Sequence, residues 1–138
     1  MEVALLESLD RDECLTLLAT VPVGRVAITD QAMPAIVPVN FLVDGSDVII
    51  RSVRGSKLAA ATRGAVVAFE ADTFDPDERT GWSVLVVGVA SHVTERAEVD
   101  RLSTLGLQPY LDGAASHYIR IPAAQISGRR LQPAADPA

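Results

Sequence analysis

The sequence is poor in the residues that several common site chemistries require. Cys14 is its single cysteine, so neither an intrachain disulfide nor a cysteine-based metal site can form within one chain. Aromatic residues make up 4% of the chain, and 12 Lys and Arg stand against 18 Asp and Glu, for a formal net charge of −6. Because nucleic-acid binding rests on clustered cations and stacking aromatics, we expect no nucleic-acid partner.

Long hydrophobic runs are missing as well. Runs such as VLVVGVA are far shorter than the roughly 18 apolar residues that a membrane span needs. The N-terminal segment MEVALLESLDRDE has no basic region ahead of a long apolar stretch, so it is not typical of a secretory signal. We therefore expect a cytoplasmic protein without a membrane partner.

The sequence shows no metal-binding or nucleophilic motif. His92 and His117 are far apart and have no third ligand at a metal spacing. The acidic segment TFDPDERTG, interpreted as a long polar loop, lacks the alternation and the glycine of an EF-hand. Cys14 has no histidine or asparagine in a recognisable relation to it, which favours a buried, inert thiol. We predict no metal ligand and no catalytic side chain.

What the sequence does contain is enough apolar material for one core. Hydrophobic residues make up 49% of the 138 residues, and with few aromatics the core must consist of Val, Leu, Ile and Ala. We predict a single domain over residues 1–131 and a flexible C-terminal tail over 132–138.

Alternating, β-branched segments predict strands. They lie near 24–29, 34–43, 47–53, 65–72 and 82–93, with a last strand and its exit over 116–131. The Asp-Gly pair in FLVDGSDVII predicts a hairpin between the second and third strands. Pro38 interrupts the second strand and indicates an edge or a bulge there, because proline has no amide hydrogen to donate.

Capping signals predict three short helices. Asp10 followed by Glu13 resembles a capping box before a helix at 11–19. Ser56 or Gly55 can cap a helix at 58–62, and Thr94 is the expected cap of a helical stretch over 95–106. Six or so strands joined mostly by hairpins, with short helices, indicate a mainly β fold, a closed or nearly closed antiparallel barrel.

A basic run, RSVRGSK, lies where the third strand meets the second helix. Arg51 and Ser52 end the strand, and Ser56 and Lys57 open the helix. Two cations, two hydroxyls and a helix start could converge there on a phosphate. The alternative is a solvated turn between strand and helix. The spacing matches neither a Walker loop nor a dinucleotide fingerprint.

The chain resembles the pyridoxamine 5′-phosphate oxidase-like family of flavin-binding split β-barrels. The resemblance covers about residues 9–130 and is carried most clearly by PVNF, by the strand-end RS before GSK, and by GWSVLVVG. Within this large family the chain is most similar to small actinobacterial-type members. The resemblance implies a six-stranded antiparallel split barrel, and a homodimer that holds FMN at its interface.

The resemblance also implies which residues hold the cofactor. The phosphate matches the basic run, the strand at PVNF runs along the isoalloxazine ring, and the start of the WSV strand reaches the flavin of the partner subunit. The implied cofactor-binding residues are Pro38, Val39, Asn40, Phe41, Arg51, Ser52, Ser56, Lys57, Trp82 and Ser83. From the residues alone, Trp82 fits a core anchor as well as a pocket wall. Ser127–Arg130 fits a solvated turn as well as a role beside the cofactor or across the dimer.

Two functions of different classes follow. The first is a flavin-dependent oxidoreductase with an unknown small-molecule substrate, in which the cofactor supplies the redox chemistry. The second is a non-catalytic carrier or sensor of flavin or of the deazaflavin F420, or an F420-dependent reductase. The substrate-side basic and aromatic residues of the pyridoxamine phosphate oxidases have no clear counterparts here, which argues against that particular activity.

Overall fold

The computed structural model describes residues 4–108 and 116–133. Within these residues the chain forms nine strands and three helices. The elements are β1 (Ala4–Leu9), α1 (Arg11–Leu18), β2 (Val23–Asp30), β3 (Met33–Asp44), β4 (Asp47–Val53), α2 (Lys57–Ala61), β5 (Val66–Asp75), β6 (Thr80–Val89), β7 (Ser91–His92), α3 (Arg96–Ser103), β8 (Ser116–Pro122) and β9 (Gln125–Pro133).

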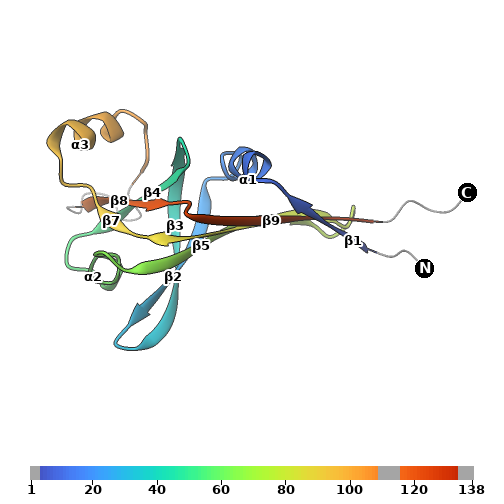
Figure 1. The fold of residues 1–138 in the computed structure, drawn as a ribbon, viewed down its shortest axis with the longest axis horizontal. Helices are drawn as coiled ribbons and strands as arrows, with labels where there is room; N and C mark the ends of the chain where they lie inside the picture. The colour runs from blue at the N-terminus through green and yellow to red at the C-terminus, as the bar shows by residue number, and fades with distance from the viewer. Residues whose placement is uncertain (1–3, 109–115, 134–138) are drawn as a thin grey trace, which may run out of the picture.

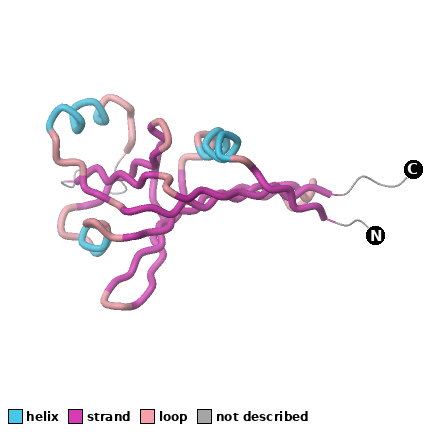
Figure 2. The backbone as a smooth tube through the Cα atoms, in the orientation of Figure 1, coloured by secondary structure: helices cyan, strands magenta, loops and turns pink. Residues whose placement is uncertain are grey.

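The strands form one antiparallel sheet in the order β1-β9-β6-β5-β2-β3-β4-β8-β7. β7 continues β6 just after Ala90, and β9 continues β8 after Ala123 and Ala124. β9 and β6 lie near one end of this order, and the strands that they continue, or that continue them, β8 and β7, lie at the other end. The sheet therefore curls round on itself. The helices lie around the barrel, while β1, β9 and the far ends of β5 and β6 extend as an arm (Figures 1 and 2).

The predicted mainly β split barrel is confirmed, with nine strands in place of six. Two of the extra strands arise because each of the two longest predicted strands is split by a bend. The third is β1, which pairs with β9 from Ala4↔Pro133 to Leu9↔Gly128. Its sequence, ALLESL, has no clear alternation, and its strand conformation depends on this distant partner. The predicted tail 132–138 remains a prediction, since β9 includes Gln132 and Pro133 and the rest lies outside the described residues.

The interior of the barrel holds the main core. Val26, Phe69, Val84 and Ile119 are fully buried in it, from four different strands. Phe69 packs edge-on against Phe41, with ring centroids 4.7 Å apart. A smaller cluster of Ile49, Leu102, Leu107 and Tyr118 lies on the opposite face of β4 and β8 and is covered by α3.

The long polar loop predicted at TFDPDERTG is wrong, because most of this segment is a hairpin. β5 runs to Asp75 and β6 begins at Thr80, with Thr73 opposite Trp82. Only a short turn remains, and the carboxylate of Asp75 accepts hydrogen bonds from the backbone amides of Asp77 and Glu78. These hydrogen bonds give the acidic segment a defined turn, although its polar composition is also typical of a long loop.

Two of the three predicted helix caps are confirmed. The Asp10 carboxylate accepts from the Glu13 amide at 2.8 Å, and the Ser56 hydroxyl accepts from the Ala59 amide at 3.0 Å. The Thr94 cap is wrong, since Glu95 is the N-cap of α3 and makes no side-chain capping bond.

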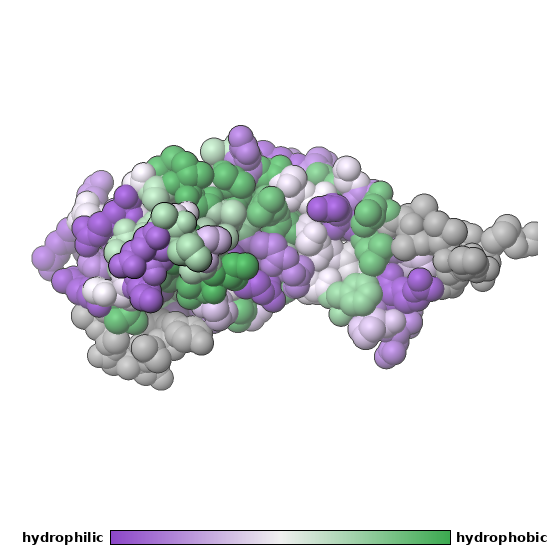
Figure 3. All heavy atoms as spheres, turned by 90° about the horizontal axis from the view of Figure 1, so that it is seen from below, coloured by the Kyte–Doolittle hydropathy of each residue, from purple (hydrophilic) through white to green (hydrophobic). Residues whose placement is uncertain are grey.

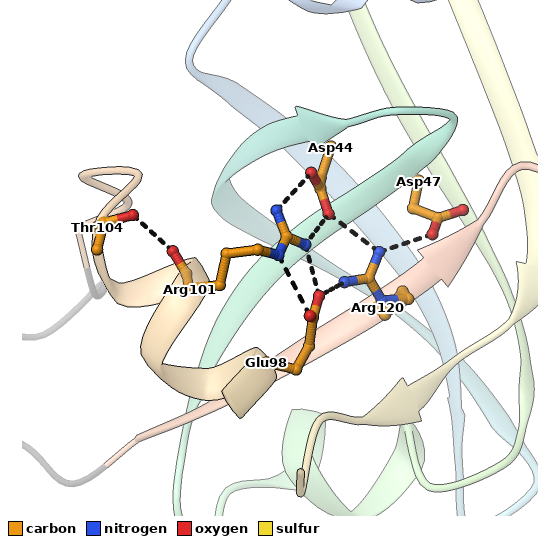
Figure 4. Close-up of polar contacts among 6 residues, drawn as sticks. All are labelled: Asp44, Asp47, Glu98, Arg101, Thr104 and Arg120. Atoms are coloured by element: carbon orange, nitrogen blue, oxygen red, sulfur yellow. Dashed lines mark hydrogen bonds and ion pairs between the residues drawn. The ribbon is translucent and has the colours of Figure 1, made fainter. Parts of the chain in front are cut away.

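A charged network ties α3 to the barrel (Figure 4). Arg120 on β8 lies 2.7 Å from the Asp47 carboxylate and 2.6 Å from that of Glu98 on α3. Arg101 reaches Asp44 at 2.6 Å. Hydrogen bonds from Arg101 hold the pKa of Asp44 below its usual range, so the stabilisation from this group is present above the ordinary carboxyl pKa and is lost as the pH falls through the lowered value.

Candidate functional site

The outer face of the sheet between β3 and β6 carries a groove. Side chains alternate along these strands, so the residues between buried core positions point outward together. The groove has a volume of about 330 Å³. Its lining consists of Arg25, Ala27, Ile36, Ala68, Phe69, Glu70, Asp72 and Leu85.

Small side chains make the floor of this groove. Ala27 on β2 and Ala68 on β5 are direct cross-strand partners, so two methyl groups stand where larger residues would fill the space. Ile36 and Leu85 rise beside them and are 71% and 42% exposed. Hydrophobic surface is broad over the barrel half of the molecule seen from the side of the β2–β3 hairpin (Figure 3). An exposed apolar face of this kind is typical of a binding surface.

One end of the groove is charged. Arg25 lies 2.9 Å from the Glu70 carboxylate and 3.8 Å from that of Asp72. Burial, together with the hydrogen bond and the charge of Asp72, raises the pKa of Glu70 to about 7, although Arg25 lowers it. This cluster was not predicted from the sequence. Its signal is that charged residues stand at outward positions of two apolar strands, Arg25 in GRVAIT and Glu70 and Asp72 in AVVAFEAD.

The structure divides the predicted ring wall between two faces. Val39 and Phe41 point into the barrel core and are 2% and 5% exposed. Pro38 and Asn40 point outward, and Pro38 is the cross-strand partner of Arg25. The edge predicted at Pro38 is confirmed, because β4 pairs with β3 only from Phe41 onward.

The two residues predicted to reach a partner's flavin, Trp82 and Ser83, point to opposite faces of β6, and both line a second pocket of about 340 Å³ near the arm. Ser83 is two residues from Leu85 on β6 and lies on the groove face, beside Asp72 in the strand register. Trp82 points to the opposite face, where it packs against the barrel core and also lines a pocket, so it has both of the places that the sequence left open. The outer face therefore carries Pro38 and Asn40 on β3 and Ser83 on β6, with β5 and β2 between them.

The predicted phosphate cradle is assembled only in part. The hydroxyl oxygens of Ser52 and Ser56 lie 2.9 Å apart, and Ser56 also caps α2. The Lys57 side chain is 83% exposed, with its ammonium 3.7 Å from the Asp30 carboxylate. These three residues form a polar cluster at the start of α2.

Arg51 does not join the two serines. It follows Ile50 and precedes Ser52 on β4, and neighbouring residues of a strand point to opposite faces. Its guanidinium donates to the Ser116 hydroxyl at 2.7 Å and to the Leu107 carbonyl at 3.1 Å, and it lies over the Tyr118 ring. The geometry ties Arg51 to the small cluster under α3.

The two histidines, distant in sequence, are brought together by the sheet. Their ring centroids lie 5.0 Å apart, and His92 Nε2 lies 2.9 Å from the Ala59 carbonyl oxygen. Burial, followed by the charges of Arg54, His92 and Arg63, lowers the pKa of His117. The part of the chain that the structure describes contains no group of three His, Cys, Asp or Glu side chains arranged to hold a metal ion.

The remaining candidates from the sequence are Cys14 and the segment Ser127–Arg130. Cys14 is buried, as predicted, and burial raises the pKa of its thiol. Within Ser127–Arg130, Arg129 is the cross-strand partner of Ser83 on the groove face, while Arg130 lies opposite Trp82 and 3.9 Å from the Glu7 carboxylate. None of the described helices combines the length and the apolar character needed to cross a bilayer.

This curled antiparallel sheet has the architecture of a split β-barrel. The chain belongs to the pyridoxamine 5′-phosphate oxidase family, whose model matches residues 10–130. It is 44% identical over 128 residues to the uncharacterised protein Rv0080 of Mycobacterium tuberculosis, covering 89% of this chain and 84% of that one.

Solved structures show the same architecture. The FAD binding protein from Mycobacterium smegmatis superposes with a TM-score of 0.79 at 37% identity, covering 91% of this chain and 97% of the other. A FAD-binding protein from Mesorhizobium loti has a TM-score of 0.71 at 22% identity, over 94% and 99% of the two chains, a likeness that concerns the fold alone.

Proposed function

We propose that this protein binds a flavin with its ring in the outer-face groove, and that it acts as a flavin-dependent oxidoreductase. The observation that carries the proposal is the groove itself, floored by Ala27 and Ala68 and placed beside the outward-facing Pro38 and Asn40. The 37% identity to a FAD binding protein supports the same class of ligand.

The residues on this face fit a flavin ring. A flat aromatic ring needs a flat apolar wall with a few polar groups at its edge. The two alanines leave the sheet surface flat, and Ile36 and Leu85 add apolar flanks. Arg25, Glu70 and Asp72 supply charged groups at one end of the groove, and Asn40 on β3 and Ser83 on β6 lie on the same face outside the groove lining.

The phosphate end fits less completely. Ser52, Ser56 and the exposed Lys57 offer hydroxyl donors and one cation, whereas Arg51 is occupied on the other face of β4. FMN is the cofactor that the sequence resemblance implies, and FAD is the ligand in the name of the Mycobacterium smegmatis protein. Both belong in the binding test, with F420 as the third candidate.

A bound flavin would supply the hydride and electron chemistry, and this chain would bind it, orient it and exclude water. The alanine pair would form the flat wall against which the ring is held, with Pro38 on the same face beside Arg25. Arg25 and the two carboxylates that it contacts, Glu70 and Asp72, would lie at the edge of the ring. Bleaching of the bound flavin by NAD(P)H would distinguish an oxidoreductase from a carrier.

The proposal includes a homodimer with the flavin at its interface. A shallow groove on an open sheet covers one side of a ring, so a second wall is needed to exclude water. The same outer face exposes Val66 and Val89 by 67% and 52%, which a second copy would cover.

We retain the cytoplasmic location as a prediction from the sequence.

Filling the groove tests its role as the flavin site. Ala68→Phe should weaken flavin binding by about a hundredfold or more, because the new ring occupies the space above Ala27, and a loss of that size corresponds to about 2.7 kcal/mol. Folding should persist, since Ala68 points away from the core. Fluorescence titration with FMN and with FAD measures the effect.

Ala97→Phe is the matched control. Ala97 is an exposed residue of α3, outside the groove lining, and its substitution adds the same ring. Its change should leave the affinity within about threefold, a difference of under 1 kcal/mol. Equal affinity of the Ala68→Phe variant and the unmodified protein would place the flavin elsewhere.

A further inference from the structure

We propose that Glu70 takes up a proton when the groove is occupied, so that ligand binding at this face is coupled to pH. The inference rests on the proposed flavin site and adds a regulation to it. In chemical terms, the Glu70 carboxylate combines with one proton from solvent to give the neutral carboxylic acid, which can then donate a hydrogen bond to an acceptor on the ligand.

The first support is where Glu70 lies. It projects from β5 into the groove, two residues from the floor residue Ala68 and beside Arg25 on β2, which pairs with Pro38 of the predicted ring wall. A ligand that covers Ala27 and Ala68 would therefore remove water from the Glu70 carboxyl group. The side chain is 33% exposed in the single chain, so it has water to lose.

The second support is the set of charges around it. On β5 Asp72 is its acidic neighbour, and on β2 Arg25 contacts both carboxylates. β6 presents only the uncharged Ser83 and Leu85, and Arg129 of β9 lies beyond Ser83. Arg25 is thus the one cation in contact with both carboxylates. Two neighbouring negative charges repel each other, which favours the uptake of a proton by one of them.

The direction of the coupling follows from desolvation. In the free protein burial and the neighbouring Asp72 already raise the pKa of Glu70 to about 7, and covering the groove withdraws more water from the charged form. The pKa in the complex then lies above the value in the free protein, and the complex holds more protons. Binding is strongest below about pH 7 and weakens as the pH rises through the interval between the two values.

Calorimetric titration with FMN and FAD in two buffers of different ionisation enthalpy measures this uptake directly. The unmodified protein should take up protons just above neutral pH, and its affinity should fall by up to about tenfold per pH unit there. Glu70→Gln should abolish the uptake and flatten the pH dependence. Glu78→Gln, in the β5–β6 turn away from the groove, should change neither.

Two further variants have predicted effects of opposite sign. Asp72→Asn removes the neighbouring negative charge and should move the inflection to lower pH, while Arg25→Gln removes the cation and should move it to higher pH. Binding with equal proton uptake in the unmodified protein and the Glu70→Gln variant would overturn this inference alone. Absence of binding by either flavin would overturn the proposed function and the inference with it.

Discussion

Gly88→Ala is expected to prevent the barrel from closing, with a loss of about 3 kcal/mol or more in the free energy of unfolding. A Cβ at Gly88 on β6 would lie 2.0 Å from the carbonyl oxygen of Pro122 and 3.2 Å from its carbonyl carbon, at the end of β8. Both obstacles are backbone atoms, so no side-chain rotation relieves the overlap. Urea unfolding followed by circular dichroism measures the loss.

Gly45→Ala is the control for this prediction. Gly45 has a φ of +62° in the β3–β4 turn, and an added Cβ would meet no atom within 4 Å. Its substitution should cost only the left-handed backbone penalty of about 1 kcal/mol. Similar losses at the two glycines would mean that β6 and β8 do not approach as closely as the structure has them.

Phe69→Ala is expected to destabilise the protein by about 3–5 kcal/mol, the usual range for deleting a buried aromatic ring. Phe69 is fully buried, packs against Phe41, and lies so close to Gly24 that an added Cβ there would be 2.4 Å from its ring. A small residue in its place would leave a cavity in the middle of the barrel. The same urea titration applies.

The same strand provides the comparison. Phe74 is also on β5 but is 60% exposed, so Phe74→Ala should cost less than about 1 kcal/mol. Because both changes remove the same ring, the difference between their losses in unfolding free energy measures the contribution of burial. A loss at Phe74 as large as that at Phe69 would contradict the packing described for the single chain.

Much of the local structure could be predicted because its signals are local. The strand predicted at 47–53 has the bounds of β4, and the Asp10 and Ser56 caps lie where hydroxyl or carboxylate side chains precede a helical pattern. The bends that divide β6 from β7 and β8 from β9 could not be predicted in this way. They arise where a strand leaves one partner for another, which is a property of the closed sheet.

The candidate site shows the same limit. Strand alternation alone separates Arg51 from Ser52 and Val39 from Asn40, and applying it within the predicted strands would have divided the ring wall correctly. The Arg25–Glu70 contact was out of reach, because it depends on the pairing of β2 with β5 across 45 residues of sequence. The arm formed by β1 and β9 likewise depends on pairing between the two ends of the chain.

The central claim is that a flavin occupies the groove over Ala27 and Ala68, and the most direct measurement is a titration of the purified protein with FMN and FAD. Absorbance and fluorescence of the flavin report its transfer from water to the protein. We predict saturable binding with a shifted absorption band and quenched emission for at least one of the two cofactors, and loss of both changes in the Ala68→Phe variant. Spectra identical to those of the free flavins at every protein concentration would contradict the account.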